Sequence, residues 1–427
     1  MPVWHEASKQ WVKVGRLAIV GVTHEQHAER CRLFAQWHEL DWPILHDPIN
    51  QIEALAVPIL VAIDEHGIVR STRPRIESFE RDFLDRTFSN DAPPIDDAAG
   101  VPDVEQLTAN AQSADTAEAW RELGDVFVLW GGEQRIDAAI DAYRKSVEHA
   151  PQDGNALFRL GVCFRQRYES AHRQPGDFQA AVDHWQRALE TDPNQYIWRR
   201  RIQQYGPRLS KPYPFYDWIR QAKSDILARG ETPVVLPVSL TGAEIARPQR
   251  DFSASTDKEK SPDADGKTHR DLKNLIEIDV SIVPRRAQPG QPVRAHIAFH
   301  PNAAQDAHWN NESDPLLVWI EPPAGWQVSH RLLRAVQPAE PESTETRRLD
   351  FEIRAPDDLA ADANDEDAAQ LKAYALYYVC EGREGACLYL RQDIQIGLDR
   401  LRSVFRECSN FKAGFRKERK KGNTNLR

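Results

Sequence analysis

The chain of 427 residues lacks long apolar runs and lacks a surplus of positive charge. No stretch approaches the roughly 18 consecutive apolar residues of a transmembrane helix, so the sequence predicts no membrane span. Lys and Arg number 55 against 65 Asp and Glu, which gives a net charge of −10. Because binding to phosphate backbones requires a surplus of cationic side chains, this balance argues against nucleic-acid binding. Gly-rich phosphate loops, a nucleophile elbow and kinase signatures are absent as well, and we expect no cofactor.

Cysteine is scarce, and its five positions are too few for a disulfide framework. Only Cys380 and Cys387 lie close together in the sequence, and no two cysteines have the Cys-x-x-Cys spacing. Two interpretations of this pair are open: a disulfide, either redox-active or structural, or two unrelated buried thiols. Cys31 and Cys163 lie among apolar helical residues, which favours core thiols. Cys408 has no apparent partner.

Histidine shows no pattern typical of a metal centre. His24, His27, His38 and His46 lie near one another only in the sequence, whereas a metal needs ligands that converge. We therefore expect no metal. We interpret His308, in "HWNN", as a turn or sheet-edge residue.

Composition and hydrophobic periodicity predict a multidomain chain with α/β, all-α and all-β parts. The predicted segments are an α/β domain (1–88), a linker (89–115), a helical domain (116–228), a second linker (229–268), an antiparallel β domain (269–398) and a basic tail (399–427). For the tail, both disorder with incidental charge and a binding arm are open.

Within the first segment, apolar runs and helical stripes alternate. We expect helices at about 3–13, 25–40 and 76–88. Strands are expected in "RLAIVGV", in "WPILHDP", and on both sides of His66-Gly67 in "VPILVAIDEHGIVR". These short parallel strands would form a small sheet with helices packed on its faces.

The helical segment contains an internal repeat that resembles tetratricopeptide helix pairs. The first copy has Trp120, Leu123, Gly124, Phe127, Ala139, Tyr143 and Pro151. The second copy has Leu157, Leu160, Gly161, Phe164, Ala181, Trp185, Ala188 and Pro193. We expect the aromatic-rich stretch 196–223 to cap the stack, and the resemblance implies a groove that binds a protein or peptide ligand.

Residues 1–88 resemble the C-terminal two-thirds of a thioredoxin-like (redoxin) domain. The resemblance is carried by "RLAIVGV", "WPILHDP" and above all "AVPILVAIDEHGIVR". It implies that Pro58 is the cis-proline that precedes the penultimate strand, where it faces the active-site disulfide and the substrate backbone. A cis-proline with a purely structural role is the alternative.

The opening stretch "MPVW" resembles the family's segment just after the catalytic Cys-x-x-Cys, where a proline lies within the first helix. The resemblance implies that this motif and its strand lie upstream of residue 1. The strand would belong between "RLAIVGV" and "VPILVAID". We expect the chain as given to lack thioredoxin-type reductase activity, since the helix N-terminus is what activates the family's cysteine. A degenerate, non-catalytic thioredoxin fold is the alternative.

Residues 270–398 resemble, more loosely, the N-terminal immunoglobulin-like domain of the DsbD family of disulfide-interchange reductases. The resemblance is carried by "QPGQPVRAHIAFH", "HWNN", "PPAGWQV" and "YALYYVCEGREGACLYL". It implies an antiparallel β-sandwich in which Cys380 and Cys387 flank a hairpin, are reduced by a thioredoxin-like partner and pass electrons onward. The spacing of the pair and the residues after Cys387 depart from the family's pattern.

Charges near the cysteine pair favour an acceptor disulfide over an activated nucleophile. Glu381 and Glu384 disfavour a thiolate, whereas Arg383 favours one. The leading hypothesis is thus a thiol–disulfide oxidoreductase-family protein with a peptide-binding centre, and the alternative is a non-enzymatic interaction scaffold. Relatives of both flanking modules often function outside the cytoplasm, yet no apolar export signal follows Met1, so the compartment stays open.

Overall fold

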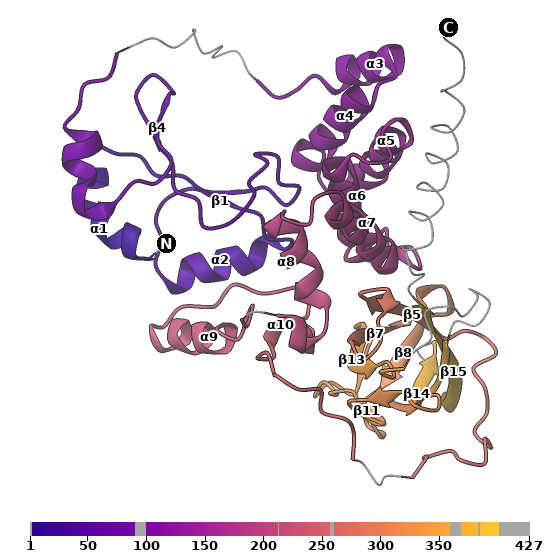
Figure 1. The fold of residues 1–427 in the computed structure, drawn as a ribbon. Coiled ribbons are helices and arrows are strands. Elements are labelled where there is room, and N and C mark those ends of the chain that lie inside the picture. Colours follow the sequence, from indigo (N-terminus) through magenta and orange to yellow (C-terminus); the bar gives the residue numbers. More distant parts are fainter. Residues whose placement is uncertain are drawn as a thin grey trace, which may run out of the picture. The chain divides into compact units, whose positions relative to one another are not determined.

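The computed structural model describes residues 2–89, 100–211, 213–256, 260–358, 369–382 and 385–400. The chain forms two compact units, Met1–Pro248 and Gln249–Arg427 (Figure 1). Helices dominate the first unit and mainly antiparallel sheets make up the second, which confirms the expected mixture of helical and β parts. The predicted basic tail, with Cys408, lies outside the described residues apart from its first two positions.

The N-terminal part of the first unit contains two separate pairs of short strands. Its elements are α1 (Pro2–Lys13), β1 (Gly21–Thr23), α2 (Ala28–Trp37), β2 (Ile44–His46), β3 (Ala62–Ile63) and β4 (Val69–Ser71). Strand β1 pairs in parallel with β2, and β3 pairs antiparallel with β4. Among the described residues no strand joins the two pairs. Large apolar side chains at every second position are consequently about half exposed, namely Val57, Ile59, Val61 and Ile63.

The expected helix over 76–88 is two short turns instead, η1 (Ile76–Ser78) and η2 (Glu80–Leu84). Between the turns lies Phe79, which is buried against Trp4 and Trp11 of α1 with ring centroids 5.3 and 5.6 Å apart. The contacts of Phe79 with α1 therefore outweigh the preference of this segment for a continuous helix.

The rest of the first unit is a succession of helices, each packed on the next from α3 to α8. They are α3 (Val104–Ala114), α4 (Ala117–Trp130), α5 (Ile136–His149), α6 (Gly154–Tyr168), α7 (Asp177–Thr191), α8 (Tyr196–Tyr205), α9 (Ile219–Ala228) and α10 (Gly242–Ile245). Helix α3 lies within the segment 89–115 that we predicted as a linker. It begins there because the Asp103 carboxylate accepts the backbone N–H groups of Glu105 and Gln106, both at 3.0 Å.

Two glycines set the close approach of the paired helices. A Cβ atom on Gly124 would lie 2.7 Å from the ring of Tyr143 on α5, and one on Gly161 would lie 2.5 Å from the ring of Trp185 on α7. Both glycines are repeat positions, so the two helix pairs pack in the same way. Because glycine has no Cβ atom, an aromatic ring of the second helix packs directly against the backbone of the first.

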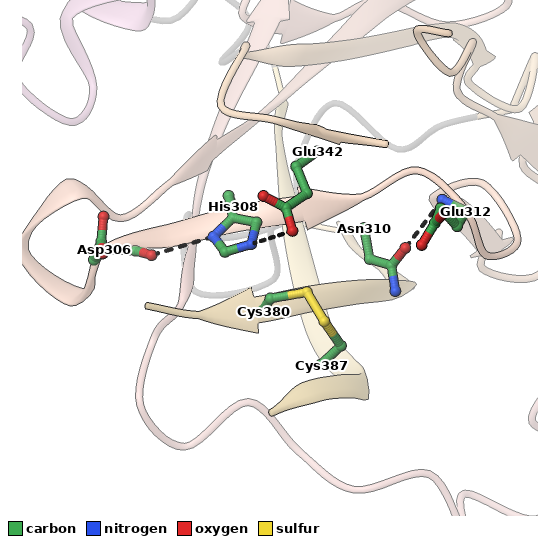
Figure 2. The surroundings of a disulfide bond; sticks show 7 residues. All are labelled: Asp306, His308, Asn310, Glu312, Glu342, Cys380 and Cys387. Atoms are coloured by element: carbon green, nitrogen blue, oxygen red, sulfur yellow. Dashed lines mark hydrogen bonds and ion pairs between the residues drawn. A yellow bond between two sulfur atoms is a disulfide. The ribbon is translucent and has the colours of Figure 1, made fainter. Parts of the chain in front are cut away.

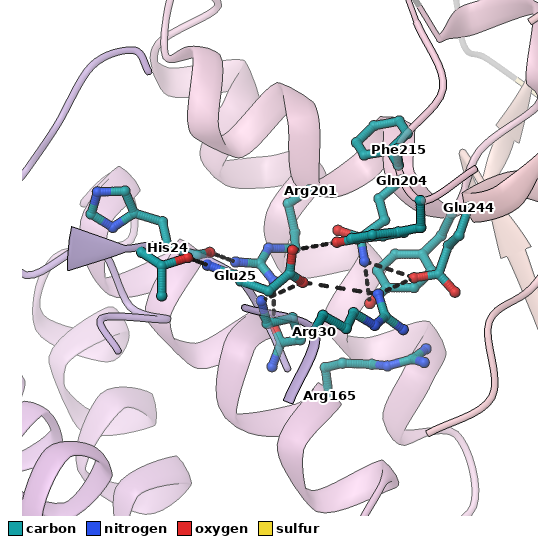
Figure 3. Close-up of polar contacts among 12 residues, drawn as sticks. His24, Glu25, Arg30, Arg165, Arg201, Gln204, Phe215 and Glu244 are labelled. Carbon is teal, nitrogen blue, oxygen red and sulfur yellow. Dashed lines mark hydrogen bonds and ion pairs between the residues drawn. The ribbon is translucent and has the colours of Figure 1, made fainter. Parts of the chain in front are cut away.

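A buried polar cluster joins the N-terminal part to the helices (Figure 3). Arg30 of α2 forms an ion pair with Glu244 of α10, and the two residues are 2 % and 0 % exposed. The second segment predicted as a linker, 229–268, thus contributes a buried carboxylate. Gln204 Nε2 donates to Glu244 Oε1 at 2.8 Å and the Thr241 backbone N–H donates to Oε2 at 2.9 Å. The carboxylate is therefore fully engaged, as a buried charge requires.

Helix α8 holds the loop that follows β1. Arg201, which is 4 % exposed, donates to the His24 carbonyl at 2.7 Å and to Gln26 Oε1 at 2.8 Å. The Tyr196 backbone N–H donates to the Leu55 carbonyl at 3.1 Å. The start of this helix is therefore covered by the chain's own N-terminal part.

Helix α6 contacts the same part of the chain. Asn155 Nδ2 donates to Glu53 Oε1 at 3.0 Å, and Gln26 Nε2 donates to the Val162 carbonyl at 3.5 Å. Helices α6 and α8, which begin the second predicted pair and the predicted cap, are thus both engaged within the chain.

The second unit contains two sheets that share one core. Its strands are β5 (Ile276–Val283), β6 (Arg286–Ala287), β7 (Pro292–Pro301), β8 (Ala307–Asn310), β9 (Leu317–Glu321), β10 (Gln327–Val328), β11 (Leu332–Arg334), β12 (Glu342–Ser343), β13 (Arg347–Arg354), β14 (Ala369–Glu381) and β15 (Cys387–Arg400). One sheet has the order β10-β13-β7-β5 and the other the order β11-β9-β14-β15-β6. Strand β8 pairs with β14 and β12. Phe299 and Phe351 from the first sheet and Trp309 and Tyr377 from the second are buried in one cluster.

We predict that Gly161→Ala destabilises the protein although alanine has the higher helix propensity. Propensity alone would add about 0.5–1 kcal/mol of stability, but the new methyl group meets the Trp185 ring and the Ala181 carbonyl. Overpacking of this kind costs about 1–3 kcal/mol, so thermal unfolding should shift downward. Gly397→Ala is the control, because its Cβ comes no closer than 4.0 Å to a neighbour. An unchanged or raised melting temperature for Gly161→Ala would contradict the close approach.

We also predict that Arg30→Ala lowers the free energy of unfolding by about 3–5 kcal/mol, because it leaves the Glu244 carboxylate buried without its cation. Arg32→Ala on the same helix is the matched control. Arg32 is 70 % exposed at its side chain, and its loss should change stability by no more than about 0.5 kcal/mol. Denaturant unfolding of both variants measures the difference, and equal effects would refute a dominant role for the buried pair.

Candidate functional site

Cys380 and Cys387 lie directly opposite each other on β14 and β15 and form a disulfide (Figure 2). Their Cα atoms are 3.9 Å apart. The pair closes the hairpin at the end where residues 381–386 connect the two strands, and residues 383–384 of that connection lie outside the described ranges. Of the two interpretations left open by the sequence, the structure contains the disulfide.

The two halves of the disulfide differ in solvent access. Cys380 is only 2 % exposed, whereas Cys387 is an exposed residue. Thiol–disulfide exchange requires that an attacking thiolate reach one sulfur in line with the bond that breaks. Access therefore favours attack at Cys387, with Cys380 as the leaving group.

His308 lies beside the disulfide, on β8. It pairs with Cys380 in the antiparallel register, so Cys380 has His308 on one side and Cys387 on the other. Both ring nitrogens have an oxygen nearby: Nδ1 is 3.4 Å from the Asp306 carbonyl oxygen, and Nε2 is 3.7 Å from Glu342 Oε1 on β12. We interpreted His308 as a turn or sheet-edge residue. It is the second residue of β8, two positions after the Asp306 turn, and it pairs with β14 on one side, whereas the pairing of β8 with β12 covers only Trp309 and Asn310.

The charge of Glu381 is compensated in the structure. Lys273 Nζ lies 2.7 Å from Glu381 Oε2 and 3.0 Å from Oε1. In the sequence Glu381 disfavours a thiolate, but in the structure its charge is paired with that of Lys273. The two residues are more than one hundred positions apart, so the sequence alone does not indicate this pair. Arg383 and Glu384, the other two charged residues near the cysteine pair in the sequence, lie outside the described residues.

An aromatic pair follows the disulfide along the hairpin. Tyr378 and Tyr389 are opposed across β14 and β15, with ring centroids 4.5 Å apart. Tyr389 is 39 % exposed, and partial burial raises the pKa of its hydroxyl. Because side chains two positions apart on a strand share a face, these rings stand on the same face as the disulfide.

Pro58 is in the first unit, and its peptide bond with Val57 is cis. Its contact with a substrate backbone stays a prediction. Cys163 is buried and Cys31 is partly buried, and burial raises the pKa of both thiols, which suits core residues better than nucleophiles.

Neither a scan against protein-family models nor a search of the curated proteins finds a match for this chain. Over the parts of the chain that the structure describes, no helix combines the length and apolar character needed to cross a membrane. In the same ranges, no three His, Cys, Asp or Glu side chains come together as a metal site. The disulfide with its neighbours His308 and Glu342 is the candidate site that the described residues offer.

The difference in access gives a direct prediction for single-cysteine variants. In Cys380→Ser the free Cys387 thiol should react rapidly with a maleimide reagent, whereas in Cys387→Ser the covered Cys380 thiol should react slowly. Peptide mass spectrometry identifies the labelled position, and Cys163, which is buried, is the internal control for a protected thiol. Equal labelling rates at positions 380 and 387 would contradict the assignment.

Proposed function

We propose that this chain takes part in thiol–disulfide exchange through Cys380 and Cys387. The observation that carries the proposal is the unequal exposure of the two cysteines in one cross-strand disulfide. A thiolate of a partner protein attacks the Cys387 sulfur, the bond to Cys380 breaks, and a mixed disulfide with Cys387 forms. A second thiol of the partner then attacks the partner's own sulfur in that mixed disulfide and releases Cys387. The partner dithiol is oxidised to a disulfide and the Cys380–Cys387 pair is reduced.

The proposal includes a family assignment for each part of the chain. We infer a thioredoxin-like segment at 1–88, tetratricopeptide pairs at 116–228 and a DsbD-type immunoglobulin-like domain at 269–398. The repeated glycine–aromatic contacts of the helix pairs and the two sheets around one core support this assignment. A protein of this composition belongs to the thiol–disulfide oxidoreductase class, with the C-terminal pair as electron acceptor and with extracytoplasmic function as the matching compartment.

A protein or peptide ligand for the helix pairs is also part of the proposal. Residues 24–26 and 53–55 already engage α6 and α8. A ligand that binds the surface covered by these residues must therefore displace them. The alternative of a non-enzymatic scaffold is favoured by a separate observation, the exposed apolar side chains at positions 57, 59, 61 and 63.

The redox test is an equilibrium measurement on the full chain. Structural disulfides have reduction potentials below about −300 mV, whereas exposed, exchangeable ones lie higher. We expect the Cys380–Cys387 pair to lie above about −300 mV and to be reduced by reduced thioredoxin, whose own potential is about −270 mV. Alkylation of the thiols followed by mass spectrometry gives the reduced fraction at each potential.

A pair that stays oxidised in the presence of reduced thioredoxin, with a potential below about −300 mV, would refute exchange and favour the scaffold. The Cys380→Ser variant is the control for partner contact, because it leaves Cys387 free. It should accumulate a mixed disulfide with an oxidised partner, and Cys387→Ser should not.

A further inference from the structure

Three side chains form one row on the outer face of the larger sheet. Strands β8, β14 and β15 place His308, Cys380 and Cys387 directly opposite one another in turn. Opposed residues of neighbouring strands point to the same face, with Cβ atoms about 4.5–5.5 Å apart. The flanking residues Ala307 and Trp309 of β8 are buried in the core, which places His308 on the opposite, outer face. Figure 2 shows the imidazole on the Cys380 side of the disulfide.

The two ring nitrogens of His308 each face an oxygen atom. Glu342 Oε1 lies 3.7 Å from Nε2, and the Asp306 carbonyl lies 3.4 Å from Nδ1. Both neighbouring atoms are oxygen acceptors, so each ring nitrogen has an acceptor on its outer side. The nearest other carboxylate in the β14 sequence, Glu381, is already paired with Lys273.

We propose that His308, supported by Glu342, stabilises the Cys380 thiolate when that sulfur leaves during exchange. The inference rests on the proposed function. When a partner thiolate bonds to Cys387, the electron pair of the broken S–S bond passes to the Cys380 sulfur. Cys380 as a whole residue is 2 % exposed, so water solvates the new charge on its sulfur poorly. The imidazolium supplies the positive charge and the proton that neutralises the thiolate.

The arrangement divides two requirements of the reaction between the two cysteines. Cys387 supplies access, and Cys380 supplies a leaving group whose negative charge is compensated by a neighbouring cation. Leaving groups that are stabilised as thiolates depart faster, so His308 should increase the rate of reduction without touching the attacking molecule.

The test measures the rate at which dithiothreitol reduces the Cys380–Cys387 disulfide in the full chain, between pH 5 and 9. Wild type is compared with His308→Gln, and His330→Gln, an exposed histidine of the same unit that contacts its neighbour Ser329, is the matched control. The ratio of wild-type to variant rates removes the ionisation of the reagent. We expect a ratio of about ten at low pH, the value of one charge-assisted hydrogen bond, that falls toward one above the range in which imidazoles ionise.

Glu342→Gln is the second variant. The Glu342 side chain is 65 % exposed, so we expect the variant to fold like the wild type. Glu342→Gln should also slow reduction at low pH relative to wild type, because the imidazole loses the carboxylate that lies beside its Nε2 atom. A ratio for His308→Gln that is constant across the pH range would overturn the inference and indicate a structural role. A wild-type disulfide that dithiothreitol reduces readily but thioredoxin does not would contradict the proposed function instead, so the two failures are distinguishable.

Discussion

The register of β14 is the constraint on which the candidate site depends. This strand pairs with β15 along its whole length, with β9 in its first half and with β8 at its end. Since side chains alternate between the two faces of a strand, a shift of one residue would move Cys380 into the core and break its alignment with Cys387 and His308. The buried Tyr377 and Val379 fix the register, because only the observed pairing brings them into the shared core.

The first unit depends on a different kind of constraint, a buried charge that two distant segments complete. Arg30 and Glu244 are separated by more than two hundred positions, and each is the partner of the other's shortest ion pair. The N-terminal part, the helices and the short helix α10 must therefore assemble together, as the cross-connections through Gln204 and Arg201 indicate. The segment 229–268, which composition marks as a linker, is structural because it contains Thr241 and Glu244 of this network.

Local patterns in the sequence predicted much of the fold but only part of the site. Helix periodicity and the repeat located α4 to α7, and the alternation of apolar residues located the β region. Cys380 and Cys387 were recognisable because they are close in sequence and flank a glycine-containing turn. The contacts of His308 and Lys273 were not, since His308 pairs with a strand residue 72 positions away and Lys273 forms its ion pair with a carboxylate 108 positions away. Helix α3 and the buried Glu244 were not predicted, because polar, Pro-rich composition is typical of linkers. The helix cap at Asp103 and the ion pair of Glu244 with Arg30 nevertheless make these segments ordered parts of the fold.

The engagement of α6 and α8 by the chain's own residues has a consequence for molecular recognition. Residues 24–26 and 53–55 belong to the same chain as these helices, so they compete intramolecularly with any external peptide that binds the same surface. A ligand that uses the same surface must first displace them, and its apparent affinity falls by the fraction of molecules in which the tether is released. The covered surface of α6 and α8 would then be available to a ligand only in molecules in which residues 24–26 and 53–55 have dissociated from it.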